Sequence, residues 1–280
     1  MKKRLFVLLA AFILLFGQAH AQAQGVNILL IGVDTLQEDA NGRSDTMILV
    51  HANPETADIR MVSFLRDLYV PIPGVGKTRL NAAYVHGGEE LLKQTLSDHF
   101  GVTVDHTVTV HFSMLADLVD QLGGIEIEVT SAERSQINKL LKDYNTSTGQ
   151  SGGELEAAGL QRLTGKQALC YSRIRKIDSD FQRTSRQQAV IAALLRKVSQ
   201  LDVWRLTGLA LKYLGKVETD MTFQDVARLA PMLTRLENLT FQTAHVPFDG
   251  AYTDETVGGM MVLKPDLERT RRLLSAFLEE

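Results

Sequence analysis

The sequence predicts a layered α/β domain in which helices cover both faces of one central sheet. Residues 26–34 form an almost unbroken apolar run that ends in an acid, which is typical of a buried central strand. Further strand-like segments alternate along the chain with segments of helical spacing, and this alternation indicates a layered α/β architecture. The chain has 280 residues, of which 45% are hydrophobic, so it can bury a large core without cross-links. Its single cysteine, Cys170, is therefore expected to be a buried thiol.

The expected strands are continuous or alternating apolar runs bounded by turn residues. The dipeptide Asn53-Pro54 marks the turn between the second and the third of them. The full set of expected strands is 26–34, 46–52, 59–65, 107–112, 125–129, 169–174 and 239–246.

The expected helices have apolar residues spaced three and four positions apart on one face. In 187–198 this spacing produces one continuous apolar stripe. The polar segment 145–153 is expected to be a flexible loop, and no linker divides the chain into two domains. The full set of expected helices is 89–99, 113–122, 187–198, 225–236 and 266–278.

The N-terminus has the pattern of an export signal. Three basic residues at 2–4 precede an apolar run at 5–17, and Ala-x-Ala pairs follow. Residues 1–23 are therefore a signal peptide or, alternatively, an uncleaved N-terminal anchor, and 24–280 form the domain. Either way the domain is extracytoplasmic, secreted or attached to the outer face of the cytoplasmic membrane. The net charge of −3 argues against nucleic acid as a partner.

Two acids stand at the junction of the first two expected strands. Asp34 ends the first strand, and Asp45 begins the second. If these strands are neighbours, both carboxylates lie near one end of the sheet, where they would suit Mg²⁺ together with phosphate oxygens. The alternative is that Asp34 caps a loop while Asp45 pairs with Arg43.

The segment 173–187 holds four arginines and a lysine in a chain of negative net charge. Such a local concentration of guanidinium groups indicates an anionic target, because the planar fork of arginine fits phosphate oxygens. Arg173 and Arg175, two apart in an expected strand, would leave the same face. Arg183 and Gln187, four apart on a helix, would also share a face.

The start of that helix adds to the anion site. Asp178, Ser179 and Asp180 stand where the helix would be capped, and helix N-termini favour anions. Arg66 follows the third expected strand. These features predict a site for a pyrophosphate-bearing substrate, whereas the alternative is a solvated surface with Arg–Asp pairs.

Several motifs in a fixed order make the chain resemble the LytR-CpsA-Psr family of cell-wall phosphotransferases. The likeness covers roughly residues 25–201 and is specific because the motifs occur in family order. These motifs are 27–34, 43–47, 63–67, 80–84, 118–125 and 163–169, followed by the segment 173–187.

The resemblance implies a single three-layer αβα domain with a central mixed sheet flanked by helices. It implies an extracytoplasmic phosphotransferase that moves a glycopolymer from a polyprenyl-pyrophosphate carrier to a hydroxyl of peptidoglycan or another wall glycan. The expected cofactor is Mg²⁺ or Mn²⁺, the lipid tail is expected in an apolar tunnel between sheet and helices, and the enzyme would work at the membrane surface.

The resemblance also implies roles for individual residues. The metal ligands would be Asp34 and Asp45. The catalytic residues would be Asp34, Asp45, Arg66 and Arg175. The pyrophosphate ligands would be Arg66, Arg173, Arg175, Arg183 and Gln187, whereas Asp178, Asp180 and Arg186 lie in the motif without an assigned role.

Two other functions fit the same residues. With water as the acceptor, the site would be a polyprenyl-pyrophosphate hydrolase. A non-catalytic polyprenyl-lipid-binding envelope regulator is the other alternative, because Leu36 stands where members of the family often have an arginine.

Overall fold

The computed structural model describes residues 25–33, 44–56, 58–149, 151–175, 177–213, 217–222, 224–226, 228–229 and 240–279. The predicted leader and Asp34 therefore lie outside the described residues, as does most of the helix predicted at 225–236.

A six-stranded mixed sheet forms the centre of the domain, with the order β10-β3-β2-β1-β6-β9. Strand β2 runs antiparallel to both β1 and β3, whereas β6 is parallel to β1 and β10 is parallel to β3. The strands are β1 (Val26–Val33), β2 (Ser44–Asn53), β3 (Asp58–Phe64), β6 (His106–His111), β9 (Glu218–Thr219) and β10 (Thr240–Val246). The predicted mixed sheet is confirmed.

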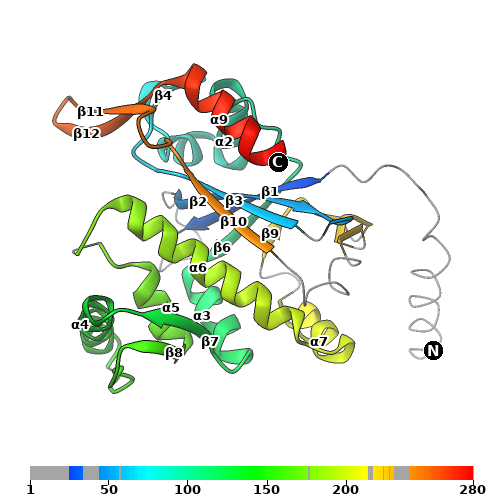
Figure 1. The fold of residues 1–280 in the computed structure, drawn as a ribbon, viewed down its shortest axis with the longest axis vertical. Coiled ribbons are helices and arrows are strands. Elements are labelled where there is room, and N and C mark those ends of the chain that lie inside the picture. Colours follow the sequence, from blue (N-terminus) through cyan, green and yellow to red (C-terminus); the bar gives the residue numbers. More distant parts are fainter. Residues whose placement is uncertain are drawn as a thin grey trace.

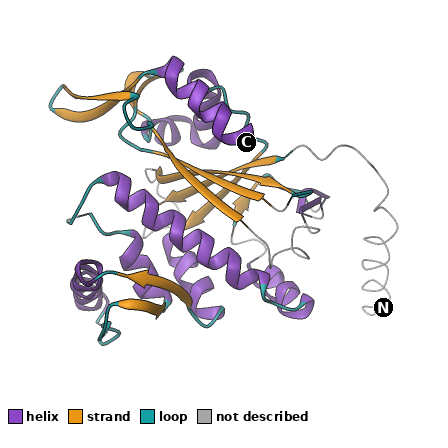
Figure 2. Cartoon of the chain, in the orientation of Figure 1, coloured by secondary structure: helices purple, strands orange, loops and turns teal. Residues whose placement is uncertain are grey.

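Helices cover both faces of this sheet, as Figures 1 and 2 show. Helices α2 (Ala82–Phe100) and α9 (Leu267–Glu279) cover one face. The opposite face carries α6 (Asp180–Ser199), beyond which lie α3 (Phe112–Gln121), α4 (Ser131–Thr148), α5 (Gly165–Ser172) and α7 (Val203–Tyr213). The predicted three-layer arrangement is confirmed. None of the described helices has both the length and the apolar character needed to cross a membrane.

The core follows the alternation of the strands. Leu29 and Ile31 of β1 point to the α2–α9 side, where they join a buried cluster with Phe64 and Leu96. Strand residues whose side chains point to the other face form a separate cluster with α6, and Ile48 of β2 is one of them. Because consecutive side chains alternate between two covered faces, the strands read as continuous apolar runs in the sequence.

Within the described part of the chain, three small two-stranded sheets lie outside the central one. The segment 125–129 was predicted as a strand, and it is one, but it pairs with 159–163 and does not join the central sheet. The pairs are β4 (Tyr69–Ile72) with β5 (Gly76–Arg79), β7 (Ile125–Val129) with β8 (Gly159–Leu163), and β11 (Tyr252–Val257) with β12 (Met260–Pro265).

The predicted strand at 169–174 is wrong, because most of it belongs to helix α5. Every residue of α5 except Lys166 is buried, so its apolar run has no helical stripe to distinguish it from a buried strand. A capping box between Thr164 and Gln167 starts the helix. The predicted loop at 145–153 also begins later than expected, because α4 continues to Thr148.

Candidate active site

The site begins with a β-bulge at Asp45. In the β1–β2 ladder Gly32 pairs with Thr46, whereas Val33 pairs with Ser44, so Asp45 is one extra residue on β2. A bulge interrupts the alternation of side chains and can turn one of them toward a new partner. The end of the β1–β2 pair is thus built to present the carboxylate of Asp45.

Two arginines from different parts of the chain contact this carboxylate. Arg66 lies just beyond the end of β3, the neighbour of β2, and its Nη1 donates to Asp45 Oδ1 at 2.9 Å. Arg175 Nη2 donates to Asp45 Oδ2 at 3.4 Å. Arg66 is also within 3.7 Å of Asp67, which in turn pairs with Arg79 at 3.1 Å. The three charged groups predicted at Asp45, Arg66 and Arg175 therefore lie together.

Arg183 is the most unusual side chain of the cluster. It is only 2% exposed, and its Nη2 donates to Asp180 Oδ2 at 2.8 Å and to the backbone oxygen of Asp45 at 3.5 Å. Its Nε and Nη1 have no hydrogen-bond partner. Burial, together with the charges of Arg175 and Arg66, lowers the pKa of Arg183 to about 10 against the opposing pull of Asp180. A buried cation with two unused donors is suited to an anionic ligand.

Other buried polar atoms on neighbouring elements also have no partner. Gln187 lies one turn after Arg183, so the two share a helix face as predicted, and its amide oxygen is unpaired. The hydroxyls of Thr46 on β2 and Ser63 on β3 are buried and unpaired as well. Buried polar groups normally have partners, so this concentration is consistent with a site that is completed by a ligand.

The two arginines before α6 are arranged differently from the prediction. They do not lie in a strand, so they do not share a strand face. Arg173 is the C-terminal cap residue of α5 and is half-buried, whereas Arg175 lies in the connection between α5 and α6 and is exposed. Of the two, Arg175 makes the contact with Asp45.

Asp34 lies outside the described residues, but its neighbours define where the chain leaves β1. Val33, the residue before Asp34, pairs with Ser44, the residue before Asp45. The proximity of the two acids therefore stays a prediction, and the register of β1 and β2 supports it.

Sequence reasoning missed a second arginine cluster beside the first. Arg186 is 5% exposed, and its Nε donates to Glu133 Oε1 of α4 at 2.8 Å. Its other nitrogens bond to both carboxylate oxygens of Asp178 and to the backbone oxygen of Ile174. The sequence did contain a signal for the helix that carries Glu133. Thr130 and Glu133 have the spacing of a capping box, which marks the start of α4.

The motifs at 118–125 and 163–169 form the scaffold that carries Arg173. Asp120 Oδ1 accepts a hydrogen bond from the Gly165 backbone N–H at 2.7 Å, which joins α3 to the start of α5. A Cβ atom on Gly165 would lie 2.0 Å from the backbone oxygen of Ala116, so only glycine permits this helix contact. These residues hold α5 in place against α3.

Apolar side chains remain partly accessible on the sheet face that carries α6. Leu30 of β1 packs on the cluster around Ile48, and Val108 is its partner in β6. Val108 and Val110 are both only half-buried, although they are apolar and belong to a central strand. This face therefore retains apolar surface that the described residues do not fully cover.

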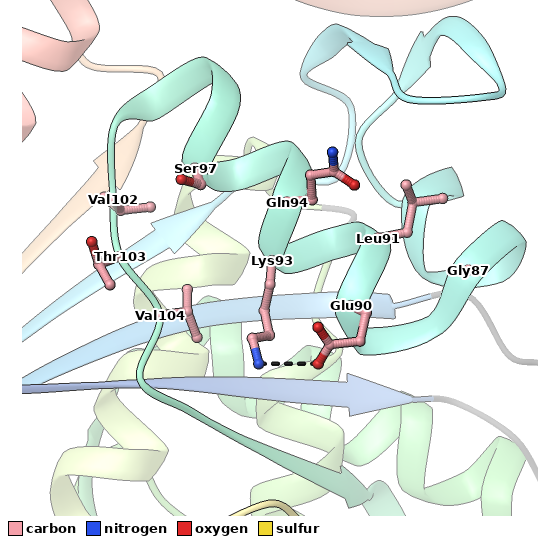
Figure 3. A pocket seen from close by; sticks show the side chains of 9 residues that line it. All are labelled: Gly87, Glu90, Leu91, Lys93, Gln94, Ser97, Val102, Thr103 and Val104. Carbon is pink, nitrogen blue, oxygen red and sulfur yellow. Dashed lines mark hydrogen bonds and ion pairs between the residues drawn. The ribbon is translucent and has the colours of Figure 1, made fainter.

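A cavity of about 560 Å³ lies elsewhere, against α2, the helix that covers the opposite face of the sheet (Figure 3). Lys93 and Glu90 form an ion pair across its floor at 3.1 Å. None of the charged groups of the arginine site lines it. Its lining residues are Gly87, Glu90, Leu91, Lys93, Gln94, Ser97, Val102, Thr103 and Val104.

The sequence matches the LytR_cpsA_psr family over residues 15–276. The chain belongs to the LytR_cpsA_psr family. A relative from Oceanobacillus iheyensis, named polyisoprenyl-teichoic acid–peptidoglycan teichoic acid transferase TagU, is 30% identical over 275 residues, covering 94% of this chain and 79% of the relative. A protein of the same name from Enterococcus faecalis is 33% identical over 210 residues, covering 73% of this chain and 64% of the relative.

Solved structures of the family have the same fold. The structure titled TagT bound to LIIa-WTA superposes with a TM-score of 0.73 at 27% identity, covering 92% of each chain. The structure titled as YwtF (TagT) with bound octaprenyl pyrophosphate lipid gives a TM-score of 0.69 at 25% identity, covering 92% of this chain and 91% of that one. The fold of this chain is thus that of LytR_cpsA_psr domains.

Proposed function

We propose that this chain is an extracytoplasmic phosphotransferase that moves a glycopolymer from a polyprenyl-pyrophosphate carrier to a hydroxyl of a cell-wall acceptor, in particular peptidoglycan. The observation that carries the proposal is Arg183, a buried guanidinium with two unused donors beside Asp45, Arg66 and Arg175. The names of the relatives and the octaprenyl pyrophosphate in a neighbouring structure support the same substrate class.

The reaction needs charge neutralisation more than covalent help from the protein. The acceptor hydroxyl oxygen would attack the phosphorus that bears the glycan. The bond from that phosphorus to the bridging oxygen would break, the bridging oxygen would leave with polyprenyl phosphate, and the hydroxyl proton would pass to a base. Arg66, Arg175 and Arg183 would bind the two phosphates and stabilise the negative charge that develops on the departing one.

The residues fit a divalent cation only if the substrate also supplies ligands. Among the residues that the structure describes, no group of three or more His, Cys, Asp or Glu side chains could hold a metal. Mg²⁺ characteristically takes one or two carboxylates and fills its remaining positions with water and phosphate oxygens. Asp45 and Asp34 would hold the ion, which would neutralise phosphate charge and favour departure of the leaving group. Mn²⁺ would serve in the same way.

The lipid tail would lie along the apolar, half-buried face of β1 and β6. Leu30, Val108 and Val110 lie on the face that carries α6, the helix that also carries Arg183. A carrier held by its diphosphate at the N-terminal end of α6 could therefore extend its prenyl chain over this apolar surface, where burial is favourable at about 25 cal/mol per Å².

The test is a transfer assay with the purified chain, a polyprenyl-pyrophosphate-linked glycan, peptidoglycan and Mg²⁺. We expect glycan phosphate on the peptidoglycan, and we expect Arg175→Ala and Arg183→Met to lower its rate about 10²- to 10³-fold. Arg162→Met is the matched control, because Arg162 is exposed and pairs with Glu126 at 3.5 Å away from the site.

The products separate this proposal from its two rivals. Release of free glycan phosphate that does not depend on peptidoglycan would identify a hydrolase instead. Binding of the carrier with no product, with or without Mg²⁺, would identify a lipid-binding regulator. Omission of Mg²⁺, or its replacement by Mn²⁺, tests the cation in the same assay.

A further inference from the structure

The second buried arginine of α6 is unlike the first, because all of its nitrogens are used within the protein. Arg186 Nε donates to Glu133, Nη1 donates to Asp178 Oδ1 at 3.1 Å and to the backbone oxygen of Ile174 at 3.2 Å, and Nη2 donates to Asp178 Oδ2. Its positive charge faces two carboxylates. Every nitrogen of Arg186 therefore has a partner within the protein, whereas two nitrogens of Arg183, one turn earlier, have none.

The contacts of Arg186 hold the chain on both sides of Arg175. The backbone of Ile174 immediately precedes Arg175, and Asp178 lies three residues after it. The Ile174 side chain is 1% exposed and adds a second hold on the same side. Arg175 itself is exposed and makes its side-chain contact with Asp45 at 3.4 Å, so the position of its guanidinium depends on the held backbone.

The third contact links this segment to a separate helix. Glu133 accepts from Arg186 and, at the same time, from the Thr130 backbone N–H at 2.9 Å in the capping box of α4. Burial alone would raise the pKa of Glu133, but the hydrogen bonds from Arg186 and Thr130 hold it below its ordinary value. The carboxylate thus stays charged and connects the start of α4 to the N-terminal half of α6.

We propose that Arg186, acting through Asp178 and Glu133, is a positioning residue that fixes the backbone around Arg175 so that its guanidinium meets the substrate diphosphate. This inference rests on the proposed function for its catalytic consequence, but the fixing of the segment is a property of the chain itself. A misplacement of about 1 Å at a reacting group can lower the rate about 100-fold. Loss of the contacts that fix the backbone around Arg175 would therefore lower the transfer rate.

Asp178→Asn is the most direct test, because it keeps the size of the side chain while removing the charge that faces Arg186. The matched control is Asp58→Asn. Asp58 accepts at 2.8 Å from Arg60, another buried arginine, which also donates to a backbone oxygen, that of Phe277, at 2.8 Å. This second pair lies on β3, and its backbone contact is with α9.

The first readout is amide hydrogen exchange, which needs no substrate. We expect exchange of residues 173–178 to accelerate at least tenfold in Asp178→Asn and in Glu133→Gln, and to be unchanged in Asp58→Asn. Unchanged exchange of residues 173–178 in both Asp178→Asn and Glu133→Gln would overturn the inference, regardless of the transfer rates of these variants.

The second readout is transfer, and it includes a double-mutant cycle. We expect Asp178→Asn to lower kcat about 10- to 100-fold, more than it changes KM, and Asp58→Asn to leave both within twofold. In an Arg175→Ala background, Asp178→Asn should have less than a twofold further effect, because its action passes through Arg175. A full, multiplicative further loss would show a general structural effect and overturn the positioning role.

The two readouts keep the inference separate from the proposed function. If wild-type protein transfers no glycan while Asp178→Asn accelerates exchange at 173–178, the fixing of this segment by Arg186 is supported and the transferase proposal fails. If wild-type protein transfers glycan and Asp178→Asn does so at the same rate, the transferase stands and the positioning role fails.

Discussion

Replacing Arg183 with Met should make the protein more stable and far less active. Arg183 is 2% exposed, and its charge is kept in a buried site beside two other guanidinium groups. A methionine of similar length fills the same space without a charge. Two nitrogens of Arg183 have no protein partner, so the proposed function implies that this side chain lowers the stability of the ligand-free protein in exchange for binding a ligand.

The magnitude follows from the lowered pKa. A fall from the ordinary arginine value to about 10 corresponds to about 3 kcal/mol of folding free energy, at 1.36 kcal/mol for each pH unit. The sign is destabilising at neutral pH, because the folded state binds this proton less tightly than the unfolded state does. That value already includes the attraction of Asp180, but the substitution also leaves the Asp180 carboxylate without this partner, which costs about 2 kcal/mol. The net expectation is a gain of about 1 kcal/mol, or about 2–4 °C in Tm for a domain of this size.

The assay is thermal unfolding of the ligand-free protein at pH 7, with Arg186→Met as the contrasting variant. Arg186 is similarly buried but bonds to two carboxylates, and removing one partner of such a network costs about 3–5 kcal/mol. A polyprenyl pyrophosphate analogue should then raise the Tm of wild type but leave that of Arg183→Met unchanged. A clear fall in Tm for Arg183→Met would refute the reasoning that this guanidinium is held for a ligand.

Three further substitutions or treatments have defined outcomes. Gly165→Ala should lower the free energy of unfolding in urea by about 1–3 kcal/mol, because its Cβ would lie 2.0 Å from the Ala116 oxygen; wild-type stability would contradict the close α3–α5 contact. Cys170 should resist iodoacetamide at pH 8 in the native protein and react readily in guanidinium chloride, because burial raises its pKa to about 11; rapid native labelling would show an open thiol. Glu133→Gln should lose less free energy of unfolding than wild type between pH 7 and pH 3. The Glu133 carboxylate, whose pKa is lowered in the folded state, stabilises the fold above its ordinary pKa of 4.5 and loses that contribution as the pH falls through its folded-state pKa. Equal loss of stability in denaturant titrations of the two proteins would contradict this.

The central strands could be predicted because they are buried on both faces. Such strands read as apolar runs too short for most helices, and the predicted runs at 26–34, 46–52 and 59–65 correspond to β1 (up to Val33), β2 and β3 (up to Phe64). The same reasoning failed for α5, where a short helix is buried all round and its apolar residues show no stripe. It also missed α4, which is mostly polar and whose clearest signal is the capping box at its start.

The sequence predicted which residues would form the site but not how they are arranged in space. The spacing of Arg183 and Gln187 correctly placed them on one helix face, because that inference needs only local structure. The contacts of Asp45 with Arg66 and Arg175 depend on a bulge, and a one-residue shift in strand register has no signal in a single sequence. The family resemblance identified which residues belong to the site. Their proximity in space depends on tertiary packing, which a single sequence does not reveal.

The distance along the chain between Asp45 and Arg175, 130 positions, has a consequence for the order in which the cluster is assembled. Because a chain is synthesised from its N-terminus, Asp45 and Arg66 are present well before Arg175 and Arg183. A partly made chain therefore has the carboxylate but only one of the three arginines around it, and the cluster is complete only after α6 has been made and has packed on the sheet.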